Sequence, residues 1–347
     1  MRRLEYDYLT PIILASLLAL LALAVSFAAP TMQRVVTEAL IYVVVVVGLY
    51  VFSGNSGVMS FGHVAFMMIA AYLSALLTLP VQKKHVLLSL TPALEHLQVS
   101  TAFSAIIACA AVGLIALLVG WPLMRLRGVV PSMATFALLI IAHVVAQNWK
   151  AVTGGRQALV GLPLDTGLWS ALGCSLLAIG VAGWYQQTKQ GTLLRCSREN
   201  EVAAESIGVD IARERLTAFA ISASICGLGG VLFAHFLGTL NPNTFYLDTT
   251  FLTLAMLVVG GFRSLSGAVS GVLILKAVSE LFRRLEEGVT LWGTDFSARA
   301  GMQEVALALI MLAILIFRPE GLLGGAEIGI AIKRRLRPRS PAGAGLQ

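Results

Sequence analysis

The sequence has few charged residues: Asp, Glu, Lys and Arg together make up 12% of its 347 residues. Soluble globular domains carry about 25% of these residues, so this chain has unusually little polar surface. Hydrophobic residues make up 57% of the chain, and the mean hydropathy is +0.84. These values exclude an ordinary soluble protein and predict an integral membrane protein.

The apolar segments also lack the alternation of apolar and polar residues that the strands of a membrane β-barrel would show. The run Ile41–Gly48, for example, contains consecutive valines without a polar residue between them. Apolar runs of about 20 residues are instead long enough to cross a bilayer as helices. We therefore predict an all-α polytopic membrane protein with about ten transmembrane helices, some short or broken, in which residues 1–347 form a single transmembrane domain.

Motifs for metal sites, disulfides and nucleotide binding are missing as well. The cysteines include no Cys-x-x-Cys pair, and most lie in or beside apolar runs, which indicates small packed thiols. No Gly-x-x-x-x-Gly-Lys-Ser/Thr motif occurs, so the chain has no P-loop for ATP, and we expect no cofactor of its own. The net charge of +7 indicates orientation in the membrane rather than nucleic-acid binding.

The apolar runs predict ten spans separated by turns and short loops. Glycine, Asn and Ser at 53–57 favour a turn, which divides the uncharged stretch 39–82 into two spans. A cleaved signal peptide is the alternative for the first span. The acidic residues Glu5 and Asp7 do not fit the positively charged region with which a signal peptide begins. The predicted spans are 9–29, 39–52, 58–79, 101–124, 129–148, 168–185, 216–237, 247–262, 265–282 and 302–317.

Ten crossings place both termini on one side of the membrane. That side carries 16 Lys and Arg residues and the other carries 8, with Lys276 inside a span. The side with more positive charge is expected to be cytoplasmic. The termini, the polar loop 186–214 and the basic tail 318–347 are therefore predicted to lie inside the cell, whereas Arg283 and Arg284 fit this arrangement least well.

The most polar stretch lies between the sixth and seventh spans. The loop 186–214 carries nine charged residues among its 29, so it must leave the bilayer. Ser197 can cap a helix that begins at Arg198, and Gly208 suits the left-handed residue that ends it. We therefore predict a helix of about ten residues, with Asp210 capping the next helix, that offers a docking surface to a soluble partner. An ordinary solvated loop with helical propensity is the alternative.

Several stretches of the sequence resemble the branched-chain amino acid permeases of the LivM type, which are membrane subunits of ABC importers. The charged helix resembles the coupling segment of such permeases, and the other matches follow in order across nearly the whole chain. Each match is short, but the combination is specific. The matching stretches are 53–66 (SGNSGVMSFGHVAF), 125–128 (RLRG), 134–137 (ATFA), 153–155 (TGG), 198–209 (RENEVAAESIGV), 260–267 (GGFRSLSG) and 317–324 (FRPEGLLG).

The resemblance implies a permease that imports branched-chain or related amino acids across the bacterial inner membrane. It also implies three partners: cytoplasmic ABC ATPase subunits that hydrolyse ATP, a second permease that is identical or related, and an extracytoplasmic substrate-binding protein. The chain itself would be a transport subunit and not an enzyme. The residues that the resemblance assigns to ATPase coupling are Arg198, Glu199, Glu201, Ala203, Ala204, Glu205, Ser206 and Gly208.

Other functions are left open by the residues alone. Sister importers of urea or short amides have similar permeases, and the loop 156–161 departs from the Asn-Gly pair that the family usually carries there. An ion-coupled secondary transporter would favour paired carboxylates in the membrane, where only Glu280 lies deep enough. An intramembrane hydrolase would need an activated serine, but Ser266 and His235 occur without a Gly-x-Ser-x-Gly turn.

Polar residues near the start of the third span are candidates for the translocation path. Asn55, Ser60 and His63 lie there, and an ionisable group at membrane depth is by default a candidate for function. The alternatives that we favour are a packed His63 bonded to a backbone carbonyl and an Asn55 that forms the turn. Lys276 and Glu280 are four residues apart, so we expect them to pair and avoid a cost of about 2.5–3.5 kcal/mol per unpaired charge.

Cys196 tests the predicted orientation, because it is the only cysteine in the loop 186–214. A membrane-impermeant thiol reagent should label Cys196 in inside-out vesicles and not in intact cells, since the side with more Lys and Arg faces the cytoplasm. The C196S variant identifies the labelled site. Labelling of Cys196 in intact cells would show that no cytoplasmic partner can reach this loop.

Overall fold

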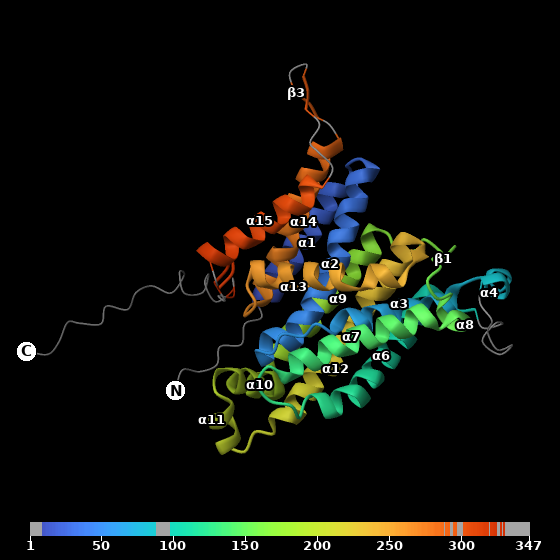
Figure 1. Cartoon of the computed structure of the whole chain (residues 1–347). Helices are drawn as coiled ribbons and strands as arrows, with labels where there is room; N and C mark the ends of the chain where they lie inside the picture. The colour runs from blue at the N-terminus through green and yellow to red at the C-terminus, as the bar shows by residue number, and fades with distance from the viewer. Residues whose placement is uncertain are drawn as a thin grey trace, which may run out of the picture.

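The computed structural model describes residues 9–87, 98–287, 289–291, 294–296, 301–318, 320–324, 327 and 329. All ten predicted spans contain a helix, and these helices form one bundle (Figure 1). The ten helices are α1 (Leu9–Ser26), α2 (Pro30–Ser56), α3 (His63–Thr78), α6 (Thr101–Leu123), α7 (Val130–Asn148), α9 (Leu168–Gln187), α12 (Ile211–Leu237), α13 (Leu247–Gly260), α14 (Leu265–Glu287) and α15 (Met302–Phe317).

Short elements connect these helices. β1 pairs with β2 and β3 pairs with β4, each pair antiparallel. The connecting elements are α4 (Val81–Leu87), α8 (Lys150–Thr153), β1 (Leu159–Val160), α10 (Lys189–Glu199), α11 (Glu201–Ser206), β2 (Thr239–Leu240), the 3₁₀ helix η1 (Pro242–Phe245), β3 (Val289–Leu291) and β4 (Thr294–Phe296). Most of the predicted basic tail 318–347 lies outside the described residues.

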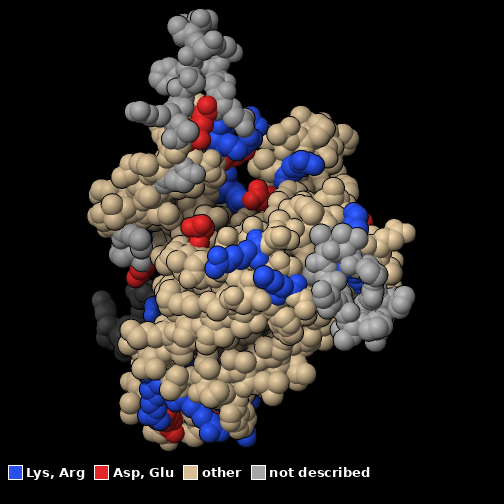
Figure 2. Space-filling view, turned by 45° about the vertical axis from the view of Figure 1, so that its right-hand side comes forward, with Lys and Arg blue, Asp and Glu red and all other residues tan. Residues whose placement is uncertain are grey.

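Within the described ranges, seven helices are long and apolar enough to cross a membrane, namely α1, α2, α6, α7, α9, α12 and α14. The other three of the ten are shorter, with 16 residues in α3, 14 in α13 and 16 in α15. The prediction of an all-α polytopic membrane protein with some short helices is confirmed. Figure 2 shows the corresponding surface: a broad area without Lys, Arg, Asp or Glu separates the charged side chains at its lower end from those at its middle and above.

The centre of the bundle is formed by α2 and α12, the two longest described helices, with 27 residues each. α12 packs against α2, α3 and α6, and α2 also packs against α9 and α14. Glycines permit this packing, because a Cβ atom on Gly230 would overlap the backbone of Met67 in α3, and one on Gly229 would overlap Val45 in α2. Small residues at helix contacts let backbones approach closely, which drives helix association where the hydrophobic effect is weak.

Many of the connections between helices gather in two separate groups. In one group, α10 and α11 contact the end of α2, the connection between α6 and α7, and the connection between α13 and α14. In the other group, β1 pairs with β2, and the Lys83 ammonium donates to the Gly161 carbonyl at 3.2 Å. Figure 1 shows α10 and α11 well separated from α4, α8 and β1. This grouping is expected of helices that cross a membrane in alternating directions.

The turn between α2 and α3 lies later than the sequence predicts. Ser53 to Ser56 are helical, and α2 is capped by the residue that follows it, Gly57, whose φ of +77° is a left-handed conformation suited to glycine. The side chains of Ser53 and Asn55, which favour a turn, form hydrogen bonds with other residues of the fold instead. The Ser53 hydroxyl accepts the Ser60 N–H at 3.3 Å, and the Asn55 amide donates to the Val51 carbonyl at 2.9 Å. The prediction that Asn55 forms the turn is therefore wrong.

The predicted ion pair between Lys276 and Glu280 is also wrong. Lys276 pairs with Glu38 of α2 at 2.7 Å, because α14 packs against that helix. Glu280 pairs with Arg283 and Arg284, each at 2.8 Å, because these residues follow it by three and four positions on the same helical face. Each charge does find a partner, as the cost of an unpaired charge in the membrane requires.

The contact between α13 and α14 tests the role of the glycines. A Cβ atom on Gly271 would overlap the Met256 carbonyl oxygen, so we expect G271A to be destabilised by about 1–3 kcal/mol through overpacking. The measurement is the apparent melting temperature of the detergent-purified protein. G173A in α9 is the matched control, since nothing lies within 4 Å of a Cβ atom there. Equal melting temperatures for the two variants would contradict the close contact.

Candidate functional site

The charged segment between α9 and α12 folds as two short helices, α10 and α11. Thr188 caps α10, because its hydroxyl accepts the Gly191 N–H at 3.1 Å. Asn200 caps α11, because its side-chain oxygen accepts the Ala203 N–H at 3.0 Å. Asparagine and threonine are both strong cap residues, so each starts a helix. Two helices therefore form where the sequence predicts one.

Ser197 is not the predicted helix cap. It lies buried inside α10, and its hydroxyl donates to the Leu194 carbonyl at 2.7 Å. The other two predicted boundaries of the segment are confirmed. Gly208 has a φ of +84°, and the Asp210 carboxylate caps α12 by accepting the Arg213 N–H at 3.1 Å.

One face of α11 is held against the rest of the chain by apolar contacts. Ala204, Val209 and Ile211 are buried together, and Leu193 of α10 packs against them. This small cluster is separate from the main core of the bundle. Burial of these side chains therefore fixes α11 against α10 and the start of α12.

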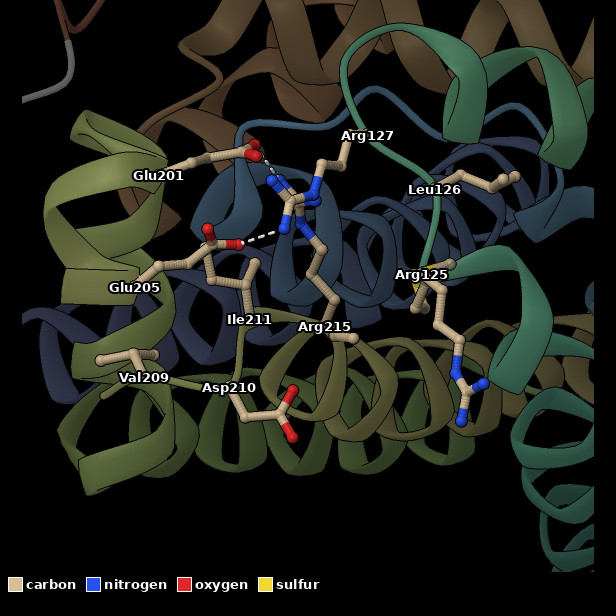
Figure 3. A pocket seen from close by; sticks show the side chains of 11 residues that line it. Arg125, Leu126, Arg127, Glu201, Glu205, Val209, Asp210, Ile211 and Arg215 are labelled. Atoms are coloured by element: carbon tan, nitrogen blue, oxygen red, sulfur yellow. Dashed lines mark hydrogen bonds and ion pairs between the residues drawn. The ribbon is translucent and has the colours of Figure 1, made fainter. Parts of the chain in front are cut away.

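Two ion pairs hold the same face, and we name their four residues the clasp: Glu201, Glu205, Arg127 and Arg215. The Arg215 guanidinium donates to the Glu201 carboxylate, and Arg127 donates to Glu205 at 2.8 Å. Figure 3 shows both arginine side chains reaching toward α11, one from α12 and the other from the connection between α6 and α7. A cavity of about 210 Å³ lies between these elements. The clasp thus joins α11 to two separate parts of the bundle.

A second set of contacts connects α10 to the bundle, and we name it the joint: Arg198, Glu199, Gly54 and Arg263. The Arg198 guanidinium donates to the Gly54 carbonyl at 2.6 Å, at the negative end of the α2 dipole. Glu199 pairs with Arg198 at 3.1 Å and with Arg263 at 3.4 Å. Because Arg263 lies between α13 and α14, the joint links α10 to three helices.

The opposite face of α11 presents apolar side chains to solvent. Val202 is 77% exposed and Ile207 is 74% exposed. Neither residue is among the predicted coupling residues. The sequence does contain a signal for them, because both are apolar residues in a highly charged stretch. Apolar side chains exposed beside charged ones, on a segment already fixed from behind, are typical of a docking surface.

The structure divides the predicted coupling residues into three groups. Arg198, Glu199, Glu201 and Glu205 bind other parts of the chain, as described above. Ala204 is buried in the apolar cluster. The remaining residues are exposed and lie beside Val202 and Ile207, namely Ala203, Ser206 and Gly208.

The membrane candidates Ser60 and His63 meet in a buried hydrogen-bond chain. His63 Nδ1 lies 2.8 Å from the Ser60 hydroxyl, and Nε2 lies 2.6 Å from the Ser222 hydroxyl of α12. Ser222 donates its only hydroxyl hydrogen to the Gly48 carbonyl at 2.6 Å, so it accepts from Nε2–H, and Nδ1 of the neutral ring accepts from Ser60. The chain of bonds joins α2, α3 and α12.

Aromatic rings enclose His63 within the bundle. The rings of Phe52, Phe66 and Phe219 lie with their centroids 5.6, 6.2 and 5.3 Å from the imidazole. His63 is packed, as expected, but the expected bond to a backbone carbonyl is wrong, because both ring nitrogens bond serine hydroxyls. One of these serines, Ser222, is a residue that the sequence does not connect with His63. Asn55 is also buried, and its side-chain oxygen has no hydrogen-bond partner within the described part of the chain.

The chain was compared with known proteins. It is 27% identical to the high-affinity branched-chain amino acid transport system permease protein LivM of Escherichia coli strain K12, an alignment that covers 88% of this chain and 74% of the relative. It is 30% identical to the probable branched-chain amino acid transport permease protein LivH of Methanocaldococcus jannaschii, over 62% of this chain and 71% of that protein. No solved structure matches the chain.

The family described as "Branched-chain amino acid transport system / permease component" matches residues 31–317, from the first turn of α2 to the end of α15. The match therefore includes the joint, the clasp, the exposed face of α11 and the buried bonds of His63. Since it extends over most of the sequence, the chain belongs to this family of transport permeases.

Proposed function

We propose that the chain is the membrane subunit of an ATP-driven importer of branched-chain or related amino acids in the bacterial inner membrane, and that α11 docks on a soluble ATPase. One observation carries the proposal. Val202 and Ile207 are exposed on a segment whose other face is fixed to the bundle by the clasp and the apolar cluster. Such a segment can receive force from outside and transmit it inward.

The sequence supports a separate source of energy. It contains no P-loop, so ATP would be bound and hydrolysed by a partner chain. The family description names a permease component of a transport system, which is consistent with further components. The partners that we propose are two ATPase subunits on the cytoplasmic side, a second permease and an extracytoplasmic binding protein that delivers the amino acid.

We also propose that Asn55, Ser60 and His63 take part in translocation, Ser60 and His63 through the helices that their hydrogen bonds connect. The hydrogen bonds of His63 link α2, α3 and α12 in an otherwise apolar interior. An importer must move such helices relative to one another to open and close a path for its solute. Directional bonds in a medium without water would favour a small number of defined arrangements of these helices.

Docking of α11 is tested by placing charge on its exposed apolar face. V202D and I207D should each reduce binding of the ATPase by more than about tenfold, because central apolar anchors of interfaces often contribute about 2 kcal/mol or more. The measurement is the amount of co-expressed ATPase that is retained by the purified permease.

L164D is the matched control for these two variants. Leu164 is also an exposed apolar residue, but it lies in the connection between β1 and α9, on the side away from α11. We expect L164D to retain the ATPase as the unmodified chain does. Normal retention by both V202D and I207D would refute docking through this face.

A further inference from the structure

We propose that Arg215 and Arg127 are the positioning residues that carry the movement of α11 into the membrane, with the clasp staying closed while the ATPase acts. This inference rests on the proposed function and adds the route by which force leaves α11. The two carboxylates stand one turn apart on α11, and each is held by an arginine from a different element. A push on α11 therefore reaches α12 through Arg215, and α6 and α7 through Arg127.

Burial distinguishes the pair between Arg215 and Glu201 from the exposed ion pairs beside it. The Arg215 side chain is only 3% exposed. Arg263 and Glu199 of the joint are 54% and 60% exposed, and Arg127 and Glu205 of the clasp are 74% and 40% exposed. Breaking a buried ion pair leaves a charge without a partner and without water, which costs much free energy. Breaking an exposed pair costs little, because water solvates both charges. The pair between Arg215 and Glu201 is therefore the stiff connection of the clasp, and the exposed pair between Glu199 and Arg263 can open at little cost.

Arg215 depends on Glu201 for its charge partner. Its Nη2 atom donates to the Glu201 carboxylate, and its Nε atom has no hydrogen-bond partner within the described ranges. The lining of the adjacent cavity adds two further carboxylates, but Glu205 pairs with Arg127, and Asp210 caps α12 and pairs with Arg213. Removing the negative charge of Glu201 would thus leave the guanidinium buried without compensation.

The helix that carries Arg215 is suited to pass the movement on. Arg215 lies in the second turn of α12, and the same helix packs against α2, α3 and α6 farther along. At Gly229 and Gly230, α12 packs so closely against α2 and α3 that no room is left for a Cβ atom. The Ser222 hydroxyl, two turns beyond Arg215, bonds both His63 and the Gly48 carbonyl. A shift at Arg215 would therefore reach the buried bonds of His63.

The test compares E201Q with E199Q in the complete transporter reconstituted in vesicles. Both changes replace a carboxylate with an amide of the same shape, but only E201Q affects the buried pair. We expect E201Q to retain the ATPase and hydrolyse ATP while importing about tenfold less amino acid per ATP. E199Q should stay within about twofold of the unmodified transporter, because Glu199 is itself 60% exposed and Arg198 keeps its bond to the Gly54 carbonyl.

Charge exchange separates transmission from simple structural support. The double variant E201R/R215E restores an ion pair at the same place, so it should recover a large part of the import per ATP that E201Q loses. If E201Q does not insert, E205Q replaces it, since Arg127 and Glu205 are exposed enough to tolerate the change. E205Q should lower import per ATP in the same direction but less, by about threefold, because the bond from Arg127 to Glu205 ties α11 to the connection between α6 and α7, whereas E199Q leaves the bond of Arg198 to Gly54 in place.

Different results overturn the two proposals. Unchanged import per ATP in E201Q, or in E205Q if it is the variant used, would refute transmission through the clasp and leave the ATPase coupling intact. A fall in melting temperature that parallels the loss of import, without recovery in E201R/R215E, would show that the clasp only supports the fold. Import by the unmodified chain that continues without any ATPase would instead refute the proposed function itself.

Discussion

The cost of placing charge in a bilayer, about 2.5–3.5 kcal/mol for a residue at its centre, determines where the polar residues of this chain can lie. Lys276 meets this constraint by pairing with Glu38 on a neighbouring helix. The charged segment between α9 and α12 meets it by leaving the bundle at one end. Once outside, its carboxylates bind arginines at the ends of the membrane helices. The same constraint therefore produces both the apolar bundle and the charged surface attached to it.

The sequence predicts those features that depend on neighbours along the chain. The ten apolar runs all become helices, and Gly208 and Asp210 take their expected places, because apolar length, glycine and capping residues act locally. Capping itself was ambiguous, since Thr188, Ser197 and Asn200 are all good caps. The choice follows from packing: Ser197 is buried, and so its hydroxyl bonds within α10.

Features that depend on distant residues could not be predicted in this way. Lys276 has an obvious local partner in Glu280, but the packing of α14 on α2 brings Glu38 closer. His63 stands out in the sequence, whereas Ser222 is an ordinary serine until α12 crosses α3 beside it. The same is true of Glu201 and Glu205, which look like free surface charges. Their pairing turns the predicted docking residues into anchors and leaves Val202 and Ile207 as the exposed face.

The break between α10 and α11 has a consequence for the direction of these contacts. In one continuous helix, residues 198, 201 and 205 would follow one another at intervals of three and four, so all three would lie on a single face. Asn200 interrupts the helix with extended backbone, at φ −157° and ψ 108°. Arg198 then reaches α2, while Glu201 and Glu205 reach α12 and the connection between α6 and α7. A single short break thus lets a segment of fewer than 20 residues bind α2 from one helix and α12 and the connection between α6 and α7 from the other.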